Sequence, residues 1–368
     1  MERILVVKVG TSTVATATGL NGKALMRLAG AVSDLADRGW RTVIVTSGAV
    51  GAGRARLGMA ERPRTIAAKQ AAASVGQGLL MHAYETFLAP LGLASAQLLL
   101  TRADLSDRQR YLNASNTLRA LLDHDVRVVP VINENDSVAI DELKFGDNDT
   151  LSALVAQLVD ADWLAILSDV DGLYDKNPGK HPDATLIPEV PELTPEIEAL
   201  AGGAGSDVGT GGMVTKLAAA RIATASGIPM ALMSGQAPAR LVDLCEGRAV
   251  RGTIFRARED RLEARKRWLA FGMAVKGVLS LDEGAVRALV QGNKSLLPTG
   301  VTGVEGDFLP GETVSLRDGA GRELGRGIAN YGATELHRIQ GRKSSEVEKI
   351  LGFKVADEVI HRDNLVVL

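Results

Sequence analysis

Short runs of apolar and β-branched residues alternate, over the first two thirds of the chain, with longer Ala- and Leu-rich stretches of helical spacing. Continuous apolar runs of this length are typical of strands that are buried on both faces. Strands that alternate with helices predict βαβ units, so we expect an α/β fold with a mostly parallel sheet and helices on both faces. The predicted strands cover Ile4–Val9, Thr42–Thr46, Leu98–Leu100, Val126–Ile132, Trp163–Leu167 and Met230–Met233, and the predicted helices Gly22–Arg38, Ile66–Phe87, Asn113–His124, Asp149–Val159 and Val214–Ser226.

The pattern changes near residue 256. Residues Arg256–Arg267 hold six basic and three acidic side chains, which is typical of a solvated linker. Residues Lys276–Phe353 show short strands, many glycines and turn signals, and so predict a small, mostly β module. We therefore expect a large domain over residues 1–255, a linker over 256–275, a small domain over 276–353 and a C-terminal tail over 354–368.

Composition and charge exclude several classes of protein. The formal net charge is −2, so no global attraction to nucleic acid or to an anionic membrane is expected. Cys245 is the single cysteine and cannot form an internal disulfide, which suits a reducing compartment. The first apolar run is short and is interrupted by Lys8, so we expect neither a secretory signal nor a membrane span, and a cytoplasmic location.

Several well-known site motifs are missing from the sequence. It contains neither the P-loop pattern nor a Gly-x-Ser-x-Gly elbow, and its five histidines have no metal-ligand spacing, so we predict no protein metal site. Residues Gly51–Gly58 begin like a dinucleotide fingerprint, but Arg56 stands where its last glycine is required. A dehydrogenase is therefore the weakest interpretation.

Polar residues that follow the predicted strands are the candidates for a site, because ligands of open parallel sheets bind at the carboxyl ends of the strands. Lys8 lies in an apolar strand and is costly to bury unless it meets an anion, and Gly10 lets the backbone approach that anion. Ser47 and Gly48 end the next strand and leave room for a ligand. The alternatives are an edge lysine that reaches solvent and a serine that only caps a helix.

A long polar loop follows the strand that ends at Ile132. It contains Asn133–Val138 and Phe145–Asp149, and loops of about fifteen residues are uncommon in compact domains and often functional. Carboxylates could hold the α-ammonium of a zwitterion and amides its carboxylate. The alternative is an Asx-rich turn in which Asp147 or Asp149 caps the following helix.

Two further clusters point to phosphate chemistry. Asp169 comes just after a buried strand, where it could orient a catalytic lysine or act through Mg²⁺, unless the segment is only a glycine turn. Gly209–Lys216 places adjacent glycines before a helix start, where backbone amides and the helix dipole favour phosphate. Lys216 opposes that dipole and so needs another reason to be there. Together the clusters predict phosphoryl transfer with two lysines and no P-loop.

These motifs resemble the glutamate 5-kinases of the amino acid kinase superfamily. The likeness runs in order over residues 1–255, and residues 276–353 resemble the PUA domain that many of these enzymes carry. It implies a three-layer α/β/α sandwich plus a small mostly-β PUA domain. The residues that carry it are KVGTS at Lys8–Ser12, VTSGAV at Val45–Val50, INENDSV at Ile132–Val138, GDND at Gly146–Asp149, LSDVDGLY at Leu167–Tyr174 and GTGGMVTK at Gly209–Lys216.

The resemblance also implies roles for individual residues. Glutamate would be held by Ser47, Asp136 and Asn148, with amides of Gly10 and Gly48 near the transferred phosphoryl group. Lys8, Asp169 and Lys216 are the implied catalytic residues, and Lys8 and Lys216 would bind the ATP phosphates. The implied ATP site comprises Lys8, Ser168, Asp169, Thr210, Gly211, Gly212, Met213, Val214, Thr215 and Lys216.

The expected partners are L-glutamate and ATP with Mg²⁺, in the first step of proline synthesis. The resemblance further implies proline as a feedback inhibitor, a homo-oligomer, and functional coupling to glutamyl phosphate reductase. An acetylglutamate or aspartate kinase on the same fold is the nearest alternative. An RNA-binding role of the PUA-like module is disfavoured, because residues 276–368 hold 12 Lys or Arg against 13 Asp or Glu.

Overall fold

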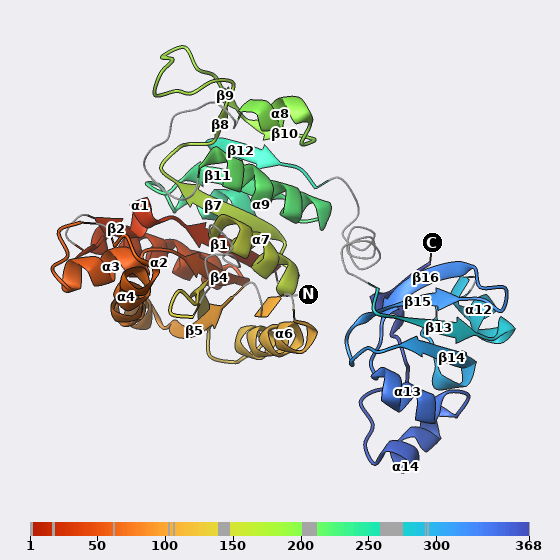
Figure 1. The fold of residues 1–368 in the computed structure, drawn as a ribbon. Helices are drawn as coiled ribbons and strands as arrows, with labels where there is room; N and C mark the ends of the chain where they lie inside the picture. Colours follow the sequence, from red (N-terminus) through yellow and green to blue (C-terminus); the bar gives the residue numbers. More distant parts are fainter. Residues whose placement is uncertain are drawn as a thin grey trace. The chain divides into compact units, whose positions relative to one another are not determined.

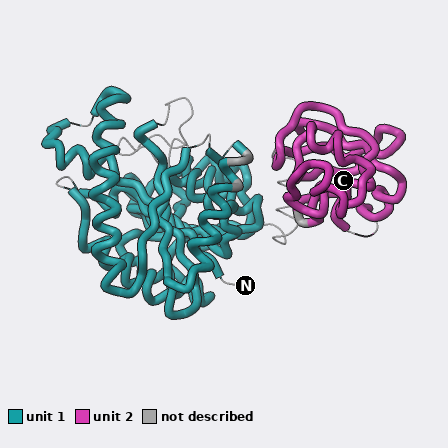
Figure 2. Tube along the Cα trace, turned by 90° about the horizontal axis from the view of Figure 1, so that it is seen from below, with its two compact units in different colours: residues 1–258 teal, residues 259–368 magenta. Residues whose placement is uncertain are grey.

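The structure is a computed structural model of the chain. It describes residues 3–16, 19–61, 63–101, 104–105, 107–138, 148–200, 212–257, 275–290, 292 and 294–367. The chain divides into two compact units, Met1–Arg258 and Glu259–Leu368 (Figure 2).

The first unit is built on an eight-stranded sheet (Figure 1). Its strand order is β10-β12-β11-β7-β1-β4-β6-β5, and every neighbouring pair is parallel except β11 with β12. Crossovers between non-adjacent strands leave β1 between β7 and β4, in the interior of the sheet. In chain order the strands are β1 (Arg3–Val9), β4 (Trp40–Thr46), β5 (Ala94–Leu100), β6 (Val128–Glu134), β7 (Trp163–Ser168), β10 (Glu189–Val190), β11 (Met230–Ser234) and β12 (Gly252–Phe255).

Helices cover both faces of this sheet, because alternate residues of the buried strands point to opposite sides. Val6 of β1 packs in one core with α6 (Arg108–Leu122), α7 (Asn148–Leu158) and α9 (Met213–Ala225). Leu5 and Val7 pack in the other core with α2 (Gly22–Asp37), α4 (Ile66–Leu88) and α10 (Arg240–Cys245). The expected three-layer α/β/α architecture is therefore confirmed.

The predicted strands and helices are all present, with shifted ends. Helix α6 begins at Arg108 rather than at residue 113, because the Asp107 side chain caps it by accepting from the Arg110 amide at 2.9 Å. The short elements of this unit are α1 (Thr11–Val14), β2 (Ala15–Thr16), β3 (Gly19–Leu20), η1 (Ala89–Leu91), β8 (Leu173–Tyr174), β9 (Leu186–Ile187) and α8 (Pro195–Ala199).

The glycine-rich segment that begins like a dinucleotide fingerprint is a helix, α3 (Ala49–Arg56), packed against α4. The crossing depends on two glycines. A Cβ on Gly53 would lie 1.7 Å from the Ala72 carbonyl oxygen, and one on Gly76 would lie 1.8 Å from that of Ala49. These glycines serve helix packing, because only a residue without a Cβ permits so close a backbone approach.

The second unit has its own five-stranded sheet in the order β14-β13-β15-β16-β17, around a separate core that contains Leu316 and Tyr331. Residues 354–368, expected as a tail, contribute to this unit: β17 pairs with β16, and Ile360 is fully buried. Its elements are β13 (Gly277–Leu281), α12 (Glu283–Val290), η4 (Pro298–Gly300), β14 (Val301–Gly306), β15 (Thr313–Arg317), β16 (Glu323–Ile328), α13 (Ala333–Ile339), η5 (Ser344–Glu346), α14 (Val347–Leu351), η6 (Arg362–Asn364) and β17 (Leu365–Val367).

None of the helices in the described ranges has the length and apolar character needed to span a membrane.

Candidate active site

Lys8 lies near the carboxyl end of β1, between Val45 of β4 and Ile166 of β7. The residue is only 4% exposed. An ammonium group so far from water needs an anionic partner. Lys8 Nζ lies 2.5 Å from Oδ1 of Asp149, the second residue of α7, whose side chain is fully buried. The solvent-exposed alternative for Lys8 is therefore wrong.

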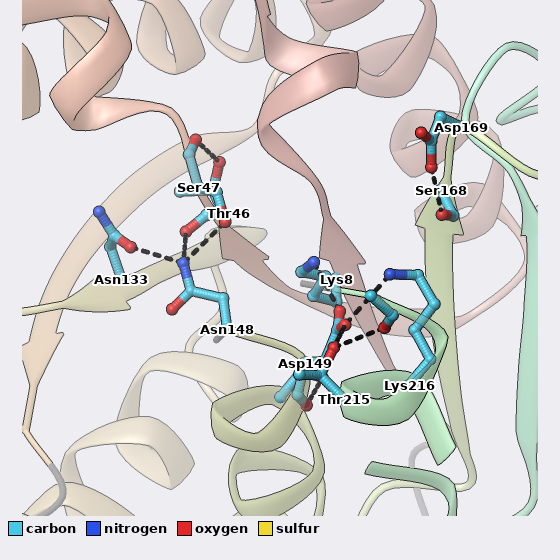
Figure 3. Close-up of polar contacts among 12 residues, drawn as sticks. Lys8, Thr46, Ser47, Asn133, Asn148, Asp149, Ser168, Asp169, Thr215 and Lys216 are labelled. Atoms are coloured by element: carbon cyan, nitrogen blue, oxygen red, sulfur yellow. Dashed lines mark hydrogen bonds and ion pairs between the residues drawn. The ribbon is translucent and has the colours of Figure 1, made fainter. Parts of the chain in front are cut away.

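Lys216 reaches the same carboxylate from another helix. It lies in the first turn of α9, it is 6% exposed, and its Nζ is 3.3 Å from Asp149 Oδ2. Thr215 Oγ1 lies 2.8 Å from the same oxygen (Figure 3). The three charged side chains Lys8, Asp149 and Lys216 sum to one positive charge in a buried place, which suits an anionic ligand.

Asp149 is the residue of this cluster that the sequence did not identify as functional. A carboxylate in the first turn of a helix is stabilised by the helix dipole. The sequence had suggested for Asp149 only that it caps the helix in this way. Its place in the first turn of α7 instead points it at Lys8 and Lys216 (Figure 3). One sequence feature could have identified Asp149 as functional: it is the last residue of the Gly-Asp-Asn-Asp motif at the end of the polar loop.

Asp169 occupies a different place. It is exposed just after β7, and its Oδ1 accepts a hydrogen bond from Ser168 Oγ at 2.9 Å. Figure 3 shows it at the strand end, apart from the carboxylate that the two lysines contact. The sequence expected an aspartate after this strand to orient a lysine; in the structure Asp149 contacts both lysines.

A second polar group lies beside the lysines, at the ends of β4 and β6. Asn148, the first residue of α7, directs its Nδ2 at the Thr46 carbonyl oxygen (2.7 Å), Ser47 Oγ (2.9 Å) and Asn133 Oδ1 (2.9 Å). Three acceptors around one amide nitrogen fix the orientation of the amide. The Asn148 Oδ1 atom is buried and has no hydrogen-bond partner among the described residues. Asn148 therefore offers a ligand an acceptor, which suits an ammonium group better than a carboxylate.

Two supports hold this region in shape. Gly48 has a φ of 108°, which favours glycine, and a Cβ there would lie 2.8 Å from Val14 Cγ2. Tyr84 of α4 donates to Thr46 Oγ1 at 2.8 Å, and its burial raises the pKa of the phenol, so the hydroxyl stays a donor. The turn after β4 is thereby fixed next to Asn148.

Comparison with known proteins identifies this arrangement. Residues 3–234 match the model of the amino acid kinase family, and residues 277–351 match the PUA domain. The chain belongs to the amino acid kinase family. It is 56% identical over 367 residues to a glutamate 5-kinase of Moorella thermoacetica, covering all of this chain and 96% of that protein. It is 49% identical over 371 residues to one of Microcystis aeruginosa, covering 100% and 97%.

Solved structures add a weaker likeness. An isopentenyl phosphate kinase of T. acidophilum, crystallised as a product complex, matches with a TM-score of 0.49 at 17% identity, over 69% of this chain and 100% of that one. The family assignment does not depend on it. The expected resemblance to glutamate 5-kinases with a PUA domain is confirmed by the full-length relatives and by the two family matches.

The other residues predicted for the site lie in different environments. Gly212 is the N-cap of α9, without a side-chain cap, and Met213 begins the helix, while Val214 is 60% exposed. Asp136 is half-buried just after β6, where its amide donates to the Glu134 carbonyl oxygen at 2.9 Å. Thr210 and Gly211 lie outside the described residues.

Proposed function

We propose that this chain transfers the γ-phosphoryl group of ATP to the side-chain carboxylate of L-glutamate. The products are L-glutamyl 5-phosphate and ADP, in the first step of proline synthesis. The observation that carries the proposal is the convergence of Lys8 and Lys216 on Asp149, next to the amide group of Asn148. The glutamate 5-kinase relatives supply the substrate class.

The two lysines would serve the phosphates. Held by one carboxylate, their ammonium groups would lie where charge develops on the oxygens of the transferred group. Fixed charges in a water-poor site stabilise such charge without reorganisation. The start of α9 would add backbone amides from Gly212 onward, because the first amides of a helix have no partner within it and the N-cap Gly212 has no side chain to cap them. We assign Thr210 to Lys216 to the nucleotide loop, and Ser168 and Asp169 to the ATP site.

Ser47, Asp136 and Asn148 would hold glutamate. The free acceptor of Asn148 and the carboxylate of Asp136 suit the α-ammonium group, and the hydroxyl of Ser47 can donate to a carboxylate. The amides of Gly10 and Gly48 would lie near the transferred group. A glutamate carboxylate is already ionised near neutral pH, so its oxygen attacks the γ-phosphorus as ADP leaves, and no general base is required.

Mg²⁺ would accompany the nucleotide. No group of three metal-ligating side chains occurs among the described residues, and the Asp149 carboxylate is engaged by two lysines. This fits an ion bound chiefly by phosphate oxygens and water, as Mg²⁺ often is. Such an ion would neutralise charge between the phosphates.

Other assignments complete the proposal. We assign the domains to residues 1–255 and 276–353, joined by a linker over residues 256–275, with the described residues after 353 completing the fold of the second domain. We place the enzyme in the cytoplasm. It would act as a homo-oligomer, with proline as feedback inhibitor and functional coupling to glutamyl phosphate reductase.

A substrate panel tests the activity. The chain is incubated with ATP, Mg²⁺ and glutamate, acetylglutamate or aspartate; ADP release is followed, and the acyl phosphate is trapped with hydroxylamine. We expect ADP and a hydroxamate with glutamate. Turnover of acetylglutamate or aspartate without turnover of glutamate would overturn the substrate assignment.

A further inference from the structure

A chain of side-chain amides leads from the proposed glutamate site to helix α4. Asn148 Nδ2 donates to Asn133 Oδ1 at 2.9 Å, and Asn133 Nδ2 donates to Gln77 Oε1 at 3.0 Å. Each amide thus donates to the next, with Gln77 as the final acceptor. None of the sequence motifs had pointed to Gln77, which lies in the middle of α4.

The direction of this chain acts together with the Thr46 carbonyl oxygen, which accepts from Asn148 Nδ2, to determine what Asn148 offers to a ligand. If Asn133 were reversed, its nitrogen would face the nitrogen of Asn148, and two donors would oppose each other. Gln77 Oε1 opposes the reversal by accepting from Asn133 Nδ2, and the Glu134 amide opposes it too by donating to Asn133 Oδ1 at 2.9 Å. Asn148 then keeps its nitrogen toward Ser47, and its Oδ1, which has no partner in the part of the chain that the structure describes, is available to accept.

Helix α4 is held in place by its close packing against α3, so Gln77 can fix the direction of the amide chain. Gly76, next to Gln77, lies against the start of α3, where a Cβ would come 1.8 Å from the Ala49 carbonyl oxygen. Helix α3 itself begins directly after Ser47 and Gly48. The amide chain therefore links the turn after β4 to α4, and the packing of α4 on α3 links α4 back to the same turn.

The same helix contacts the polar loop a second time. Ser74 lies one turn before Gln77, so both side chains are on the same side of α4. Its Oγ lies 2.8 Å from Ser137 Oγ and donates to the Gln70 carbonyl oxygen at 2.9 Å, which leaves Ser137 as donor of the shared bond. Helix α4 therefore contacts the end of β6 at Asn133 and the loop after β6 at Ser137.

We infer that Gln77 is a positioning residue for glutamate: it orients Asn133 and, through it, the acceptor oxygen of Asn148. This rests on the proposed function. Gln77 acts on the amino-acid side of the site, while the lysines and α9 serve the nucleotide. A loss at Gln77 should therefore weaken binding of glutamate and leave binding of ATP unchanged.

The test compares Gln77→Met, Gln77→Glu and the control His82→Met, which places the same new side chain at an exposed position of α4. For Gln77→Met we expect the KM for glutamate to rise about tenfold, because the buried Asn133 amide loses its acceptor. The KM for ATP of Gln77→Met should stay within about twofold of that of the unmodified chain. The KM for glutamate of His82→Met should also stay within about twofold. Gln77→Glu keeps an acceptor oxygen and should restore most of the affinity.

A double-mutant cycle separates positioning from general weakening. If Gln77 acts through Asn133, the variant with both Gln77→Met and Asn133→Ala should bind glutamate no worse than Asn133→Ala alone. An unchanged KM for glutamate in Gln77→Met, a parallel rise in the KM for ATP, or additive effects in the cycle would overturn the inference. Failure of the unmodified chain to phosphorylate glutamate would instead overturn the proposed function.

Discussion

Lys8 Nζ lies 2.5 Å from Asp149 Oδ1, a contact between the central strand β1 and the first turn of α7. Because Lys216 contacts the other oxygen of the same carboxylate, Asp149 sets the separation of the two ammonium groups. One buried acidic residue thus places two cations that would otherwise repel each other.

Replacing Asp149 with Asn keeps the shape of the side chain and removes its charge. We expect kcat to fall about 100-fold, because the two lysines lose the group that holds their positions. Steady-state ADP release measures the effect, with circular dichroism as a check of folding. The exposed Asp34→Asn on α2 is the control and should keep normal turnover. A folded Asp149→Asn variant with normal kcat would contradict the positioning role.

Replacing Lys216 with Ala should lower kcat by about 100- to 1,000-fold, the usual loss when one fixed group that stabilises transition-state charge is removed. The fold should remain intact, because Asp149 keeps its ion pair with Lys8. The exposed Lys23→Ala on α2 serves as the matched control. Single-turnover phosphoryl transfer with saturating ATP isolates the chemical step; an unchanged rate there would remove Lys216 from the catalytic group.

Two glycines of α4 should respond oppositely to the same substitution. Gly76→Ala should destabilise the first unit by about 3 kcal/mol, because its Cβ would overlap the Ala49 carbonyl group. Gly78→Ala should stabilise the same helix by up to about 1 kcal/mol, since no atom lies within 4 Å of its Cβ and alanine favours helix. Urea unfolding curves give both values, and equal effects would show that the close approach of α3 and α4 is not required.

The thiol of Cys245 should be unreactive in the folded chain. Burial raises its pKa from 9.0 to about 12, so the thiolate is scarce at pH 8. An unfolded thiol loses its proton from about pH 9, and the folded one only near pH 12. The free energy of unfolding should therefore fall as the pH rises through this range. Labelling with a chromogenic disulfide should be slow at pH 8 and fast in urea; rapid labelling of the folded chain would contradict this.

The sequence predicted the α/β/α class because strand and helix periodicities are local properties. The strand predicted over Ile4–Val9 matches β1, and the helix predicted over Ile66–Phe87 matches α4, each to within a few residues. The segment Ala49–Arg56 was not predicted as a helix, since three-dimensional packing of Gly53 on α4 compensates for its poor helix propensity. Strand β17 was missed because its three residues are too short to show a period and depend on pairing with β16.

For the site, the sequence by itself determined which strand ends carry chemistry: a lysine in a buried strand and glycines before a helix restrict the local ligand to an anion. Only the tertiary structure decided that Asp149 contacts both lysines and that Gln77 ends the chain of amides. The physical reason is that a charge or an amide finds its partner through space. Crossovers in the sheet bring β1, α7, α9 and α4 together from distant parts of the chain, and no local pattern records those encounters.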